Sequence, residues 1–260
     1  MSLDLEAIRR KLKQLQEGNK GQAKVSDYVW KPPVGQSTIR IVPYAYNQSN
    51  PFQELYFHYE VGKRTMISPR SFNRPDPIVE FSDRLKQTGD KEDWKLGKKL
   101  EPKFRVMVPV IVRGEEDKGV RFWAFGTKIY TELLGYISDE DYGDITDLTN
   151  GRDLTIEHIP AAAEGGFPEV KIRVKPNKTA ATNDPEIARM IVQEQKQITE
   201  VYNELSYDDM KAALEKWLNP TPEPADNPAG KPVASSTKVK QTNSISDVKS
   251  AFDDLFKDTE

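Results

Sequence analysis

Short strand-forming runs, widely separated along the chain, constrain the fold of this protein more than any other feature. Glycine- or proline-containing stretches lie between most of these runs, whose residues are rich in β-branched and aromatic side chains. The runs are Gln36–Val42, Phe104–Arg113, Val120–Phe125, Asp153–Ile159 and Glu169–Lys175. Short strands of this kind suit a small antiparallel barrel. We therefore expect a mainly β fold with helical additions, in the α+β class.

Helices are predicted at both ends of this strand-rich region. Leu5, Ile8, Leu12 and Leu15 share one helical face near the N-terminus, beside a basic cluster. This short helix could dock on its own core or on a neighbouring copy of the protein. Asp184-Pro185 and Ser206–Asp209 each predict the start of a helix that closes the core.

Composition limits the remaining possibilities. The 260 residues allow one sizeable core with appendages, and 37% hydrophobic against 30% charged residues predicts that part of the chain is solvated. The chain has no cysteine, which excludes disulfides, thiolate metal sites and cysteine nucleophiles and fits a reducing compartment. No signal peptide and no membrane span are predicted.

Basic and acidic residues are unevenly distributed along the chain. Residues 95–130 hold nine Lys or Arg against four Asp or Glu, with aromatic residues among them. Residues 61–75 hold four positive charges and no acid. In contrast, residues 244–260 hold five acids and two lysines, and they follow a proline-rich segment, 219–243, that predicts a solvated linker. A basic, aromatic body with an acidic tail favours a protein that binds a polyanion. When no polyanion is bound, the acidic tail would screen the basic body.

The strand at residues 169–175 carries one basic face. Its apolar residues alternate with Lys171, Arg173 and Lys175, which places three positive charges in a row. In the strand at residues 120–125, alternation puts Arg121 beside Trp123, an arrangement that a platform for stacking unpaired bases would need. Burial of Trp123 under a helix is the alternative.

Catalytic signals are weak. The two histidines, His58 and His158, lie a hundred residues apart, and no phosphate-binding glycine loop or zinc-protease motif occurs. The acidic residues of 139–147 could hold a divalent cation, but the glycine spacing does not match a calcium loop, and we interpret them as a solvated loop. His158 could simply bond to the backbone.

The order of these segments resembles the single-stranded DNA-binding (helix-destabilising) proteins of T-even-type bacteriophages. The hydrophobic strand 104–113 leads through an acidic turn to Val120-Arg121-Phe122-Trp123-Ala124-Phe125-Gly126-Thr127-Lys128-Ile129-Tyr130, and the family has a similar aromatic-basic strand. The basic N-terminal arm and the Asp-Asp-Leu tail also look alike. The layout is similar over nearly the whole length, and the residue-level likeness is concentrated in 99–155.

The resemblance implies an OB-fold-like core with a groove for single strands. It implies that the arm mediates cooperativity, through Arg9, Arg10 and Lys11, and that the tail binds replication and recombination proteins, through Asp253, Asp254, Leu255 and Phe256. It also implies that the tail competes with DNA for the groove, that Trp123 stacks on bases, and that the protein works in the cytoplasm of the infected host cell.

The family commonly has a zinc site of one histidine and three cysteines, including a Cys-Pro-x-Cys pair. Here His58 stands at a plausible position, but Asp76-Pro77-Ile78-Val79 replaces that pair, so we expect no zinc and no other cofactor. Proline stiffness and packing are then expected to hold the loop Ser68–Ile78.

These observations favour a non-enzymatic protein that coats single-stranded DNA cooperatively and with little sequence preference, in replication, recombination and repair. The expected parts are an arm (1–20), a DNA-binding core (21–218), a linker (219–243) and a partner-binding tail (244–260). The expected DNA contacts are Lys63, Arg64, Arg70, Phe72, Arg74, Lys98, Lys99, Lys103, Arg105, Arg121, Trp123, Lys128, Lys171, Arg173 and Lys175. A protein-interaction adaptor and, third, a metal-dependent nuclease using 139–147 are the alternatives.

Overall fold

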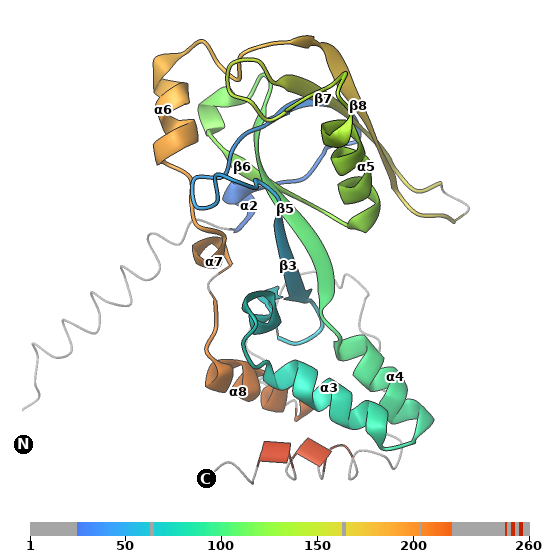
Figure 1. Cartoon of the computed structure of the whole chain (residues 1–260). Helices are drawn as coiled ribbons and strands as arrows, with labels where there is room; N and C mark the ends of the chain where they lie inside the picture. The colour runs from blue at the N-terminus through green and yellow to red at the C-terminus, as the bar shows by residue number, and fades with distance from the viewer. Residues whose placement is uncertain are drawn as a thin grey trace, which may run out of the picture. The chain divides into compact units, whose positions relative to one another are not determined.

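The computed structural model describes residues 25–62, 65–162, 165–202 and 204–219, together with Val248, Ala251, Phe252, Leu255 and Phe256. The chain forms two compact units, whose elements are labelled in Figure 1. Unit 1 comprises Met1–Gln53 and Met107–Gln197, and unit 2 comprises Glu54–Val106 and Ile198–Glu260. The core expected at 21–218 is thus divided between the two units.

The fold is mixed α+β, and its strands form one eight-stranded sheet. The strands are β1 (Val29–Trp30), β2 (Gly35–Ile41), β3 (Gln53–His58), β4 (Met66–Ile67), β5 (Lys103–Val112), β6 (Arg121–Phe125), β7 (Arg152–Ile159) and β8 (Glu169–Lys178). The main path runs β1-β6-β5-β2-β7-β8, while β3 pairs with β4 and β5. All five expected strands are confirmed. Closure into a barrel stays a prediction, since β1 and β8 end the path.

The described helices are α2 (Val25–Tyr28), α3 (Pro77–Gln87), α4 (Lys91–Leu100), α5 (Thr127–Ser138), α6 (Pro185–Gln193), α7 (Ile198–Val201) and α8 (Tyr207–Leu218), with 3-10 turns η1 (Pro69–Phe72) and η2 (Glu116–Lys118). Both expected helix starts are confirmed. The Asp184 carboxylate accepts from the Glu186 and Ile187 N–H groups, and the Ser206 hydroxyl accepts from the Asp209 N–H. The helix that begins after Asp184, α6, ends at Gln193, and the short helix α7 follows before α8.

Unit 1 is built on the paired strands β2, β7 and β8, and α5 lies beside β8 in Figure 1. Ile39, Ile41 and Ile156 are fully buried in these strands. The fully buried Arg40 on β2 donates through Nε to Asp153 Oδ1 at 3.0 Å, and Arg113 donates to the same carboxylate. A buried guanidinium needs such partners, because losing its water is costly.

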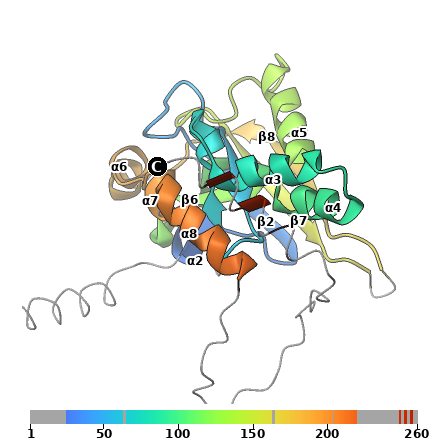
Figure 2. The same ribbon diagram turned by 90° about the horizontal axis from the view of Figure 1, so that it is seen from below.

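Unit 2 places helices α3, α4 and α8 around an apolar cluster that includes Ile78, Phe81 and Leu85. Figure 2 shows α3 and α4 side by side. Their close approach requires Gly97, because a Cβ there would lie 2.7 Å from the Ser82 carbonyl oxygen. The Ser82 hydroxyl also donates to the Gly97 carbonyl at 2.7 Å, which fixes the crossing of the two helices.

Candidate nucleic-acid interface

Strand β3 of unit 2 presents an aromatic side chain away from its buried face. Leu55 and Phe57 are buried, while Tyr56 between them is half-buried, as the alternation of a strand requires. Tyr56 packs edge to face against Phe104 of β5, with ring centroids 5.5 Å apart. A partly open ring in a rigid strand can offer its face to a ligand without first being ordered.

The turn η1 is fastened to this strand. The Ser68 N–H donates to the Tyr56 carbonyl at 2.8 Å, and the Tyr56 N–H donates to the Ser71 hydroxyl at 2.8 Å. Asn73 ends the turn with φ of 55°, a left-handed conformation that asparagine tolerates. These bonds hold Phe72 and the two arginines beside it, Arg70 and Arg74, in a fixed relation to β3.

Three arginines of unit 2 lie over aromatic rings, and we call these contacts the arginine–aromatic pairs. The distances from guanidinium carbon to ring centroid are 5.6 Å for Arg70 over Tyr56, 5.0 Å for Arg74 over Phe72 and 5.9 Å for Arg105 over Tyr59. Each lies within the range of a cation–π interaction. Tyr59 is 47% exposed and Phe72 is 36% exposed.

The arginine–aromatic pairs combine two kinds of recognition. A guanidinium held over a ring keeps N–H donors that can bind phosphate, and an exposed ring face can stack on an unpaired base. Partial burial raises the pKa of Tyr59 above its usual value, so its hydroxyl stays neutral and does not repel phosphate. Arg74 also pairs with Glu204, which borders an adjoining hollow of about 470 Å³.

A buried hydrogen-bonded cluster supports this region. His58 Nε2 lies 2.9 Å from Asp76 Oδ2, and its Nδ1 lies 3.2 Å from the Leu100 carbonyl oxygen. The Ser68 hydroxyl donates to the same carboxylate, whose other oxygen caps α3. His58 thus has an oxygen partner at each of its two ring nitrogens.

The protonation of Asp76 agrees with this geometry. Burial by itself raises the pKa of its carboxyl, but the hydrogen bond and charge of His58 and the bonds from Ser68 and the Val79 N–H outweigh burial, so the pKa lies below its usual value. Asp76 is thus a carboxylate that accepts from several donors. Proline stiffness and packing alone were expected to hold the loop Ser68–Ile78, and this is wrong, since the cluster ties the loop to β3 and α4 through Ser68, Asp76 and His58.

The residues present do not fit the family's zinc site. His58 Nε2 is occupied by Asp76, and the described part of the chain contains no group of three histidine, cysteine or acidic side chains that could hold a metal ion. A hydrogen-bonded ion pair therefore occupies the position at which the family's zinc would be expected.

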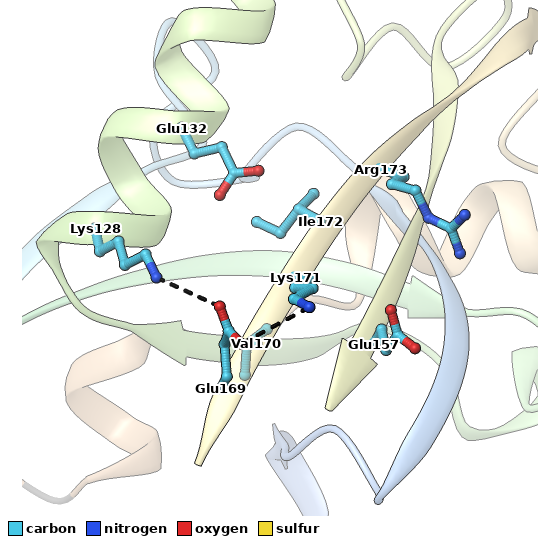
Figure 3. Close-up of a pocket in the computed structure, with 8 residues that line it drawn as sticks. All are labelled: Lys128, Glu132, Glu157, Glu169, Val170, Lys171, Ile172 and Arg173. Atoms are coloured by element: carbon cyan, nitrogen blue, oxygen red, sulfur yellow. Dashed lines mark ion pairs between the residues drawn. The ribbon is translucent and has the colours of Figure 1, made fainter. Parts of the chain in front are cut away.

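Unit 1 gathers a second set of cations along β8. Lys171, Arg173 and Lys175 are all exposed, while Ile172 between them is buried, which confirms the predicted basic face. With Lys128 of α5, two of these cations line a hollow of about 360 Å³ (Figure 3). Three glutamates share its wall: Glu132, Glu157 and Glu169.

The hollow is therefore balanced in charge. Glu169 lies 3.8 Å from the amino groups of both Lys128 and Lys171, between which it stands in Figure 3. Lys128 is 80% exposed, and such long surface pairs are worth little. The lysines can thus exchange Glu169 for a phosphate at small cost.

Trp123 does not reach this surface. It is 2% exposed and packs against Trp30 and Phe125, with centroids 5.9 and 4.6 Å away. Strand β6 lies between β1 and β5, and three of its five residues are buried. The stacking role predicted for Trp123 is therefore corrected to a role in the core. Its neighbour Arg121, whose side chain is only 11% exposed, donates to Glu115 at 2.6 Å, which lowers the pKa of that carboxyl.

The other expected residues are scattered. Lys98, Lys99 and Lys103 of unit 2 are exposed, and the first two pair with Glu101 and Glu60. Leu255 and Phe256 of the tail are half-buried. Several expected contacts lie outside the described residues: Arg9, Arg10, Lys11, Lys63, Arg64, Asp253 and Asp254.

Tyr56, Tyr59 and Phe104 were missed as site residues. The alternation of Leu55 and Phe57 with polar or amphipathic residues predicts that Tyr56 points away from the core, so a strand assignment at 53–58 would have found it. No sequence signal places Arg105 over Tyr59, because the contact joins residues of different elements.

The acidic loop and His158 have local roles. Asp139, Asp144 and Asp147 each accept backbone N–H bonds from residues two or three positions later, which stabilises their own turns. His158 Nδ1 lies 2.9 Å from the Pro32 carbonyl oxygen, the backbone contact that we expected.

Comparison with known proteins identifies a family. A family model described as gp32 DNA binding protein like matches residues 34–219, which include both units' candidate surfaces. No curated protein matches the chain. Within the described residues, no helix combines the length and apolar character needed to cross a membrane.

Proposed function

The chain belongs to the gp32 DNA-binding protein-like family, and from this premise we propose that it coats single-stranded DNA cooperatively in phage replication, recombination and repair. The family supports binding to single-stranded DNA. The observation that carries the residue-level proposal is the set of three arginine–aromatic pairs in unit 2. Arginine and an exposed ring together suit a flexible strand, which presents phosphates and unstacked bases at once.

We assign the contacts by chemistry. Tyr59 and Phe72 stack on bases, because they are the exposed rings of the pairs. The three paired arginines and the exposed lysines Lys98, Lys99 and Lys103 neutralise phosphates. In unit 1, the basic row of β8 and Lys128 neutralise further phosphates along the strand. These side chains contact the phosphate backbone and the flat faces of the DNA bases, so binding has little sequence preference.

The ends of the chain complete the proposal. The basic arm, with Arg9, Arg10 and Lys11, contacts a neighbouring copy along the strand. The acidic tail recruits replication and recombination proteins in the cytoplasm of the infected host cell. Coating acts by mass action, since a protein that binds only the open strand shifts melting toward single strands. No step in this function needs a catalytic group.

Competition between forms of DNA tests the proposal. A labelled oligo-dT strand is titrated across a salt series with a matching duplex and an acidic polypeptide as competitors. We expect binding that weakens with salt and resists both competitors. Equal competition by duplex would contradict single-strand binding, and preferential capture of the acidic polypeptide would favour the adaptor alternative.

A further inference from the structure

The C-terminal segment contacts unit 2 through apolar side chains. Val248, Ala251, Phe252, Leu255 and Phe256 are helical and pack against the apolar cluster of this unit. Their spacing of three and four residues places them on one helical face. In Figures 1 and 2 these short red fragments lie beside α3 and α8.

Phe252 is the centre of the contact. It is 7% exposed, and its ring meets the fully buried Phe81 of α3 edge to face at 5.7 Å. Phe256 packs against Phe252 with centroids 4.7 Å apart. An aromatic pair buried to this degree is typical of an anchor that dominates a binding surface.

Helix α8 holds the second ring. Lys211 Nζ lies 4.6 Å from the Phe256 ring centroid and 3.5 Å from the Phe256 carbonyl oxygen. A cation over the ring together with a bond to the end of the segment orients the segment on α8. None of these contacts depends on a carboxylate.

We propose that the face formed by α3 and α8 is a receptor for the chain's own C-terminal segment, held by Phe252 and Phe256 rather than by charge. The occupant is the segment of the same molecule. A partner protein that binds these two rings must first displace the segment from α3 and α8. Docking and partner recruitment are therefore mutually exclusive, and release of the segment opens an apolar face on unit 2. This inference does not depend on DNA binding.

The absence of natural cysteine makes a direct test possible. A spin label on Thr259→Cys should broaden the amide signals of α8 and α3, and the broadening should persist in high salt. Asp253→Asn with Asp254→Asn serves as the charge control and should retain it. Phe256→Ser should lose it, and Phe252→Ser with Phe256→Ser should lose it completely.

Two further measurements guard against misfolding and exchange between copies. An excess of a synthetic peptide of residues 244–260 should remove the broadening from the otherwise unaltered labelled chain, whereas the peptide with both phenylalanines replaced by serine should not. Loss of the broadening in high salt or in the charge control would overturn the proposal. A mixture of spin-labelled copies without isotope enrichment and enriched copies without the label should show no broadening. The same broadening in this mixture would overturn the assignment to the same molecule.

Discussion

At the residue scale, the buried hydrogen-bonded pair of His58 and Asp76 connects β3 with α3. His58 and Asp76 are 2% and 4% exposed, so neither side chain has water to replace a lost partner. The absence of zinc ligands could be predicted from the sequence, because the chain has no cysteine. The hydrogen-bonded cluster could not be predicted, since Asp76 and Leu100 meet His58, and Ser68 meets Asp76, only through tertiary structure.

Replacing Asp76 tests this pair. Asp76→Asn keeps a capping side chain but removes the buried carboxylate that pairs with His58 and Ser68, so we expect a loss of about 3–5 kcal/mol in the free energy of unfolding near neutral pH. Urea denaturation of both proteins measures the difference. Ser71→Ala, which alters the η1 contact but not the ion pair, provides the control.

The pH dependence has a definite sign. The folded pKa of Asp76 lies below its unfolded value, so its contribution is present above the unfolded pKa, about 4, and is lost as the pH falls through the folded pKa. The difference between wild type and Asp76→Asn should therefore shrink in acid. A difference that stays constant from neutral pH down to about pH 3 would contradict the assigned carboxylate.

Trp123 provides the opposite case, in which a suggestive sequence position proves structural. We expect Trp123→Ala to cost about 3–5 kcal/mol of stability because it leaves a cavity beside Trp30 and Phe125. The affinity of the folded fraction for oligo-dT should stay unchanged. Differential scanning calorimetry and a titration below the unfolding transition measure the two effects, and a weakened affinity in stable, folded protein would restore the stacking role.

At the element scale, the exposed face of a strand could be predicted where the other face is buried. It was predicted wrongly for a strand that is covered on both faces. β8 alternates, so its basic face could be identified before the structure was known. β6 has neighbours on both sides and covered faces, so alternation could not separate Trp123 from the core. Helices α3, α4 and α5 were not among the elements predicted from the sequence.

The basic row of β8 is tested through salt dependence. Replacing Lys171, Arg173 and Lys175 by glutamine should reduce the slope of log K against log salt concentration. The reduction should be up to about 0.7 for each phosphate of a single strand that these side chains neutralise. The exposed lysines Lys91, Lys95 and Lys216, replaced in the same way, serve as the charge-matched control. Equal slopes for the two variants would remove β8 from the interface.

At the scale of the whole molecule, the order of charged and apolar segments identified the family, although the division into two units was not foreseen. The chain crosses between the units three times: within β3, within β5 and between α6 and α7. Such crossings leave no compositional mark, unlike the proline-rich linker at 219–243.

Deletion of residues 1–20 tests cooperativity. If the arm contacts a neighbouring copy, the deletion should leave binding to a very short oligonucleotide nearly unchanged and weaken the coating of long strands. Sedimentation or electron microscopy of partly saturated long DNA would show clusters with the full chain and dispersed copies with the shortened one. Equal losses on short and long DNA would place the arm in the DNA site instead.

Truncation after Asn243 tests the screening role of the tail. Removing the acids should tighten DNA binding most at low salt, because salt screens the competing charges. Titrations at low and high salt, compared with the full chain, measure the effect. An unchanged affinity at low salt would contradict the screening role of this segment.

The central claim is that exposed rings of the arginine–aromatic pairs stack on single-stranded DNA, and titration of labelled oligo-dT with aromatic variants tests it most directly. Tyr59→Ala and Phe72→Ala should each weaken binding by about 1–3 kcal/mol. Tyr46→Ala, which removes a ring that is 55% exposed in unit 1 and lies outside the pairs, should bind as the wild type does. Wild-type affinity in both Tyr59→Ala and Phe72→Ala would contradict the account.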